Sequence, residues 1–219
     1  TICLIFLFLV FSILSHHSLS QPKKTFSWKV QSKTNTVYVV GSIHYLKNEM
    51  YPLDEQIEKA FDQSDVLVVE ANVGDTNKVD IQKLIGSALY LDNETLEKHV
   101  SPGTYEMVKK ELEVLGIPLD LASKQKPWFL ALTLVSLEIA KLGFDPNYGI
   151  DKYFLSKSTG NKKILELESF DYQTNLFASL PEKDQELFLV YTLKDIKALK
   201  EELDKLIQAW TSGDENGME

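Results

Sequence analysis

The stretch from residue 36 to residue 72 constrains the fold of this chain more than any other. It reads TVYVVGSIHYLKNEMYPLDEQIEKAFDQSDVLVVEAN: a β-branched run, a glycine-containing turn with a histidine, a polar-capped segment, and a second apolar run. The first run predicts a strand over residues 37–40. Asp54 predicts the cap of a helix that carries Ile57, Ala60 and Phe61 on one face.

The second apolar run, residues 65–70, alternates too little for a half-exposed strand, so we expect a strand covered on both faces. A β-α-β crossover of this size places its two strands parallel. His44 and Glu70 then lie at the same carboxyl edge, where open α/β sheets hold their ligands. This convergence is the sharpest functional indication in the sequence.

Length and charge narrow the class of protein. A chain of 219 residues can bury a sizeable core, and one α/β domain is the expected organisation. A formal net charge of −9 argues against a nucleic-acid partner, since phosphate binding requires a basic surface. Every positive side chain is lysine, so the chain has no guanidinium group to clamp a carboxylate or phosphate.

Residues 1–21 predict a signal peptide or an amino-terminal anchor. The segment from Ile2 to Leu14 is almost wholly apolar, too short for a comfortable membrane span, and small residues near Ser20 fit a cleavage site. We therefore expect a secreted or periplasmic (cell-envelope) protein that contacts a membrane only through this segment. Cys3 lies inside it, so the mature part would have no disulfide, catalytic thiol or cysteine-bound metal.

The rest of the chain alternates strand and helix signals. Residues 26–30 predict a strand that forms a hairpin with residues 37–40, and residues 163–168 predict a further strand. Helices are expected over residues 79–90, 102–115, 128–142 and 150–160, and from Pro181 to about Trp210. The last helix is amphipathic and has no strand after it to pack on, so we expect the domain to continue beyond this sequence.

Four polar residues fall at strand ends or helix starts: His44, Glu70, Asp151 and Glu168. One imidazole and three carboxylates suit a divalent metal such as Zn²⁺, Mn²⁺ or Co²⁺, which would activate water and polarise a carbonyl. One carboxylate could instead act as a general base. The alternative is that each residue caps a helix or satisfies loop backbone. The chain has no tight HExxH-type spacing that would argue against this alternative.

Several separated motifs occur in the order typical of one family. They are Trp28-Lys29-Val30, the Gly-x-x-His motif from Gly41 to His44, Tyr51-Pro52-Leu53, the run ending at Glu70, Gly149-Ile150-Asp151, Leu165-Glu166-Leu167-Glu168, Gln173, Leu180-Pro181 and Trp210-Thr211-Ser212-Gly213-Asp214. Together they closely resemble the TraB/GumN (PrgY-like) family over residues 26–214.

The resemblance implies an α/β fold, a mixed sheet with flanking helices, related to the TIKI membrane metalloproteases and more loosely to erythromycin-esterase-like and ChaN-like proteins. In the family a Gly-x-x-His motif occurs twice, and the histidines with acidic residues are thought to form a metal-dependent hydrolytic site. By position, His44 takes the first motif, Glu70, Asp151 and Glu168 are its acidic partners, and Gln173 is a further polar member. No second Gly-x-x-His follows position 44, so we expect the amino-terminal two-thirds of the domain, with an incomplete site.

The resemblance implies a metal-dependent hydrolase, most simply a peptidase acting on a peptide or small molecule. His44 would bind the metal or orient the water, Glu70 would be a ligand or general base, and Asp151 and Glu168 would complete the site. Two other readings stay open. One is a non-catalytic envelope protein that binds a peptide signal in an apolar groove. The other is a haem- or iron-binding protein with His44 or Tyr45 as the axial ligand.

Overall fold

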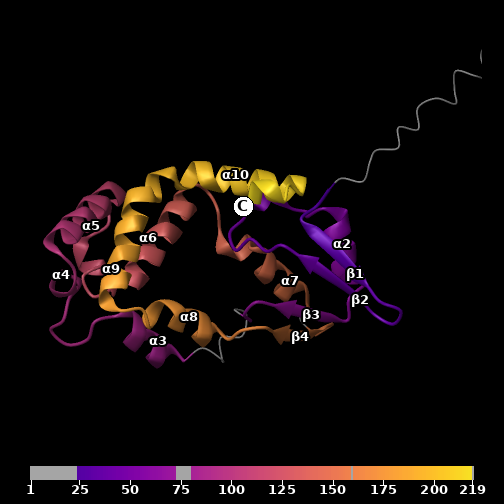
Figure 1. The fold of residues 1–219 in the computed structure, drawn as a ribbon, viewed down its shortest axis with the longest axis horizontal. Coiled ribbons are helices and arrows are strands. Elements are labelled where there is room, and N and C mark those ends of the chain that lie inside the picture. The colour runs from indigo at the N-terminus through magenta and orange to yellow at the C-terminus, as the bar shows by residue number, and fades with distance from the viewer. Residues whose placement is uncertain (1–23, 73–79, 159, 219) are drawn as a thin grey trace, which may run out of the picture.

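The computed structural model describes residues 24–72, 80–158 and 160–218. The described part of the chain is elongated: its strands β1 to β4 gather at one end and a group of helices at the other, with helix α10 running along the top between them (Figure 1). This is the α/β architecture with flanking helices that the sequence predicts. The expected leader, residues 1–21, lies outside the described residues.

The predicted hairpin is present. Strands β1 (Ser27–Gln31) and β2 (Thr36–Val40) pair antiparallel, with Trp28 opposite Val39 and Val30 opposite Val37. The turn is closed by Ser32, whose hydroxyl oxygen accepts hydrogen bonds from the backbone N–H groups two and three residues later. Such side-chain-to-backbone bonds favour a tight turn over further strand.

The expected parallel pairing across the crossover is wrong. Strand β3 (Val66–Val69) pairs in parallel with β4 (Lys163–Glu166), and in the described part of the chain these two form a sheet separate from β1 and β2. Helix α2 (Glu55–Asp62), capped by Asp54 as predicted, connects the two sheets. The hairpin with β1 occupies one edge of β2, and β3 pairs with β4 instead of with the other edge. Strand pairing depends on contacts between segments distant in the chain, which the local pattern around α2 does not specify.

Strand β3 is also not covered on both faces. Val66 and Val68 are 40% and 49% exposed, whereas Val69 is 4% exposed. Helix α7 (Ile150–Ser158) packs on one side of β3. Since successive side chains of a strand point to opposite faces, one covering helix leaves alternate valines open.

Most predicted helices are present with small shifts of their bounds. Helices α4 (Leu96–His99) and α8 (Phe170–Ala178) were not predicted from the sequence. The predicted helices that are present are α3 (Ile81–Ala88), α5 (Pro102–Leu115), α6 (Pro127–Lys141), α7, α9 (Glu182–Asp195) and α10 (Leu199–Ser212). Residue 79, where the first of them was expected to begin, lies outside the described residues. As predicted, Ser101 caps α5 and Gly116 ends it in the left-handed region at φ 68°.

The expected single helix after Pro181 is in fact two helices. A 3-10 turn, η5 (Ile196–Ala198), separates α9 from α10, and the chain changes direction there (Figure 1). Ile196 belongs to the core of the helical end, whereas Trp210 belongs to the core of the strand end. The segment after Pro181 therefore contributes side chains to both cores. A single straight helix would not reach both of them.

Helix α6 forms the centre of the helical end. Leu130, Ala131 and Leu134 are at most 1% exposed and belong to the core of the helical end, in which α6 packs against α9. A helix that is apolar nearly all round is buried in this way. Of the helices in the described ranges, none combines the length and apolarity that a membrane crossing requires.

Candidate functional site

The Gly41–His44 segment follows β2 directly and is held from two sides. The indole Nε1 of Trp210, on α10, donates a hydrogen bond of 2.7 Å to the carbonyl oxygen of Gly41. The backbone N–H of Gly41 donates to the carbonyl of Phe26 at 3.0 Å. A Cβ atom at position 41 would lie 2.2 Å from a ring carbon of Phe26, so this close approach requires glycine.

A second glycine brings the start of α7 against the same segment. The N–H of Ile150 donates to the carbonyl of Ile43 at 2.9 Å. A Cβ atom at Gly149 would lie only 2.3 Å from the carbonyl oxygen of His44. The missing side chain thus lets α7 begin beside His44, and Asp151 in its first turn faces the imidazole.

The imidazole of His44 lies between two carboxylates. Its Nδ1 is 3.3 Å from Oδ2 of Asp151, and its Nε2 is 3.7 Å from Oε2 of Glu70. The side chains of His44 and Glu70 are 63% and 51% exposed, whereas that of Asp151 is 15% exposed. The structure therefore brings together three of the four predicted site residues, at a surface that a ligand can reach.

The two acids shift the protonation equilibrium of the imidazole. The contact with Asp151 raises the pKa of His44, and the charges of Asp151 and Glu70 add to the rise, against an opposing effect of burial. For Asp151, burial by itself would raise the pKa, but the hydrogen bonds from His44 and Ser42 outweigh it and the pKa is lowered. The pair therefore favours a charged carboxylate beside the ring.

Ser42 is a member of the site that the sequence reasoning missed. Its hydroxyl donates a short hydrogen bond to Oδ2 of Asp151, the same oxygen that faces His44. The only sequence signal was its place inside the Gly-x-x-His motif. With Ser42 on one side and His44 on the other, the carboxylate of Asp151 is held in one orientation.

Glu168 lies close in the backbone but faces elsewhere. Its N–H donates to the carbonyl of Glu70 at 2.9 Å, which extends the pairing of β3 and β4. Its carboxylate accepts a hydrogen bond of 3.4 Å from Gln173, the other predicted polar member. Among the described residues, no ion pair or hydrogen bond joins Glu168 or Gln173 to His44.

The pleating of the strands explains why the side chains of Glu70 and Glu168 lie on opposite faces of the sheet. Glu70 follows the exposed face of β3, with Val66 and Val68, and it is itself exposed. Glu168 follows the half-buried face of β4, with Ile164 and Glu166. Neighbouring strand ends thus carry acids on opposite faces.

The donor atoms fit part of a metal site. Within the described ranges, no group of three or more His, Cys, Asp or Glu side chains is arranged to hold a metal ion. Nε2 of His44 and Oε2 of Glu70 are 3.7 Å apart, close to the separation of about 3.4 Å between two ligands of a tetrahedral metal. A carboxylate on the other ring nitrogen, as Asp151 provides, is typical of metal-binding histidines.

Tyr45, the other haem-ligand candidate, points away from this surface. Its hydroxyl lies 3.1 Å from that of Ser136 on α6, and its ring packs against a small core with Phe144. His44 and Tyr45 therefore do not form a common site.

Comparison with known proteins places the chain in a family. The sequence model of the TraB/PrgY/gumN family matches residues 26–219. The chain is 30% identical over 147 residues to the uncharacterized protein YbaP of Escherichia coli, covering 67% of this chain and 53% of that protein. An uncharacterized protein of Treponema pallidum is 24% identical over 212 residues, with 92% of this chain and 61% of that protein covered. The chain thus spans little more than half the length of the curated relatives it matches, and no solved structure matches it.

Proposed function

The chain belongs to the TraB/PrgY/gumN family, and from this membership we propose that it acts as a metal-dependent hydrolase, with peptides as its substrates. The observation that carries the proposal is the arrangement at His44: a carboxylate faces each ring nitrogen, and the Glu70 side of the ring is open to solvent. Both named relatives are uncharacterized, so the activity rests on this geometry and the chemistry of its residues.

Each residue has a distinct part in the proposal. His44 and Glu70 would hold a divalent cation such as Mn²⁺, Co²⁺ or Zn²⁺, which when bound supplies Lewis-acid activation of water and of a carbonyl group. Asp151 positions the imidazole by accepting from Nδ1, and Ser42 in turn positions Asp151. Two ligand side chains are fewer than a stable site uses, so the whole protein would contribute further ligands.

A hydrolysis assay tests the proposal. Purified protein expressed from the complete gene is incubated with a mixture of unmodified peptides, and new termini are identified by mass spectrometry. We expect cleavage that a chelator abolishes, that one of the three cations restores, and that His44→Ala removes. Cleavage that survives both chelation and His44→Ala would contradict the proposal.

A specific surface favours the alternative, a non-catalytic protein that binds a peptide signal. The open face of β3 and β4 carries four exposed apolar side chains beside Glu70: Val66, Val68, Leu165 and Leu167. An exposed apolar patch of this kind marks a surface at which another molecule binds. Peptide binding that persists in the presence of chelator and in His44→Ala, without cleavage, would favour this function.

We also propose that the protein is exported. The apolar run from Ile2 to Leu14, followed by small residues near Ser20, supports this location. Fractionation of native cells with an antibody to the protein tests it: recovery in the envelope or medium is expected, and recovery only with cytoplasmic markers would contradict export.

A further inference from the structure

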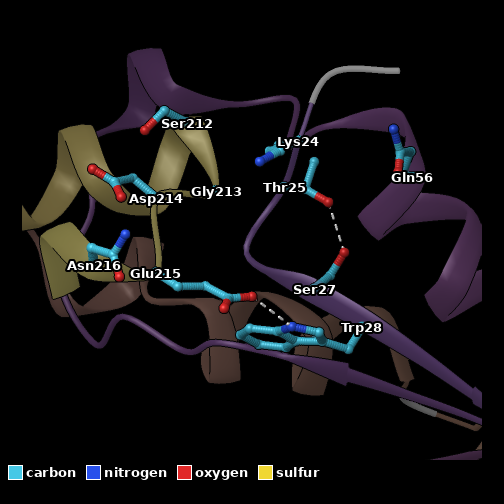
Figure 2. Close-up of a pocket in the computed structure, with 10 residues that line it drawn as sticks. All are labelled: Lys24, Thr25, Ser27, Trp28, Gln56, Ser212, Gly213, Asp214, Glu215 and Asn216. Carbon is cyan, nitrogen blue, oxygen red and sulfur yellow. Dashed lines mark hydrogen bonds between the residues drawn. The ribbon is translucent and has the colours of Figure 1, made fainter. Parts of the chain in front are cut away.

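A cleft separate from the His44 surface opens where the two ends of the described chain meet. Its volume is about 710 Å³, within the range of small-ligand sites. One wall is the segment leading into β1, with Lys24, Thr25, Ser27 and Trp28, and the other is the end of α10 with the loop after it (Figure 2). The loop leads into the 3-10 turn η6 (Asn216–Met218).

An aromatic ring lies in this cleft and is held in place. The indole of Trp28 is 40% exposed, although large aromatic side chains are usually well buried. Its Nε1 donates a hydrogen bond of 2.9 Å to Oε1 of Glu215, whose carboxylate lies at the edge of the ring in Figure 2. Phe26 packs edge-on against the indole, with ring centroids 4.8 Å apart. The hydrogen bond and the ring contact thus fix the indole next to open space.

The wall opposite β1 is negative. Glu215 supplies a carboxylate beside the indole, and α10 ends here at Gly213, so its terminal carbonyl groups add partial negative charge. The carboxylate of Asp214 lies against Gly217 and points away from the indole (Figure 2), but its charge adds to the negative potential of this wall. The indole bond uses one oxygen of Glu215, and a carboxylate has acceptor sites for several donors.

An aromatic face beside a carboxylate is the chemistry that recognises an organic cation. We propose that this cleft binds an alkylammonium or guanidinium group, as carried by a lysine or arginine side chain of a peptide. The cation would lie over the Trp28 ring, attracted by its π-electrons, and donate hydrogen bonds to Glu215. Lys24 on the other wall opposes the cation by like charge.

The cleft is independent of the hydrolase proposal, because none of its residues touches His44, Glu70 or Asp151 in the contacts described above. Binding is therefore measured without turnover, on protein kept metal-free by chelator. Loss of hydrolytic activity would leave this inference intact, and failure of cation binding would leave the hydrolase proposal intact.

Fluorescence titration with a matched pair of ligands tests the cleft. The probes are Nα-acetyl-lysine methylamide and its neutral counterpart Nα-acetyl-norleucine methylamide. Trp128 and Trp210 are 2% and 6% exposed, so a surface ligand should change chiefly the emission of Trp28. We expect a saturable change with the lysine amide alone, weakened by salt.

Two charge variants complete the test. Glu215→Gln keeps an acceptor for the indole N–H but removes the charge, and should weaken binding about threefold to tenfold. Glu113→Gln makes the same change on α5, at the other end of the molecule, and should leave binding unchanged (Figure 1). Equal binding of the neutral amide, unchanged affinity in Glu215→Gln, or no saturable binding by the lysine amide would overturn the inference.

Discussion

Nδ1 of His44 lies 3.3 Å from Oδ2 of Asp151, and this contact joins the loop after β2 to the first turn of α7. It depends on a chain of specific backbone contacts. Gly149 lets the helix begin against the His44 carbonyl, and Ile150 donates to Ile43 at 2.9 Å. The imidazole is therefore oriented by the fold and does not need a bound ligand to find its carboxylate.

The first prediction concerns the pKa of His44. In metal-free protein we expect it above the ordinary value of 6.5, because the neighbouring carboxylates stabilise the imidazolium. Asp151→Asn keeps the size of the side chain but removes its charge, and should lower the pKa. NMR titration of the His44 ring protons measures both values, and an unchanged pKa in Asp151→Asn would contradict the contact.

The sign of the linked stability follows from the same shift. A raised folded-state pKa means that the folded protein binds the proton more tightly than the unfolded chain does. This contribution is fully present below pH 6.5 and is lost as the pH rises through the raised folded-state pKa. The wild type should therefore lose part of its stability advantage over Asp151→Asn in that interval, measured by denaturant unfolding on both sides of it.

Gly149→Ala should destabilise the protein. The added Cβ would lie 2.3 Å from the backbone oxygen of His44, which cannot move as a flexible side chain would. The cost is about 1–3 kcal/mol of unfolding free energy. Gly86→Ala in α3 is the control: its Cβ would meet nothing within 4 Å, and it should add about 0.5–1 kcal/mol. Equal effects of the two variants would contradict the close approach at Gly149.

Trp210→Phe removes the hydrogen bond to Gly41 while keeping an aromatic ring in the core. We expect a loss of about 1–3 kcal/mol, since the Gly41 carbonyl loses its donor. Trp128→Phe is the matched control, because its indole donates a similar bond of 3.1 Å to Ser87 far from the site. Both should lower stability, but only Trp210→Phe should also change the His44 ring resonances. A shift of those resonances in Trp128→Phe alone would contradict this assignment.

The two strand-end glutamates should differ in function. Glu70→Gln should weaken metal binding by at least about tenfold, the usual effect of losing a partner at a metal site. Glu168→Gln should change it little, since that carboxylate bonds Gln173 and lies on the other face. Cation titrations followed by NMR or calorimetry compare the two. A larger loss in Glu168→Gln would contradict the geometry.

The sequence predicted local structure better than pairing. Polar caps such as Asp54 and Ser101 and the left-handed Gly116 act on adjacent backbone, so they can be read directly from the sequence. Which strands pair depends on distant contacts, and so the two separate sheets could not be derived. The turn at η5 was also missed, because no glycine or proline marks it in the sequence.

The site residues were likewise predicted where the signal was local and missed where it depended on distant contacts. His44, Glu70 and Asp151 were identified because each stands at the end of a strand or the start of a helix, where side chains converge. Ser42 and Trp210 were missed because their roles are contacts with distant residues, Asp151 and Gly41. Glu168 was included because it ends a strand, but the pleat turns it to the other face.

Metal content measured by mass spectrometry tests the central claim most directly. The protein is expressed from its complete gene, purified without chelator, and compared with His44→Ala and with His99→Ala. His99 is a demanding control, since it also lies between two acids, 2.9 Å from Glu94 and 3.3 Å from Glu182. The account predicts near-stoichiometric divalent metal in the wild type and in His99→Ala, and its loss in His44→Ala. Metal retained in His44→Ala, or none in any form after reconstitution, would contradict it.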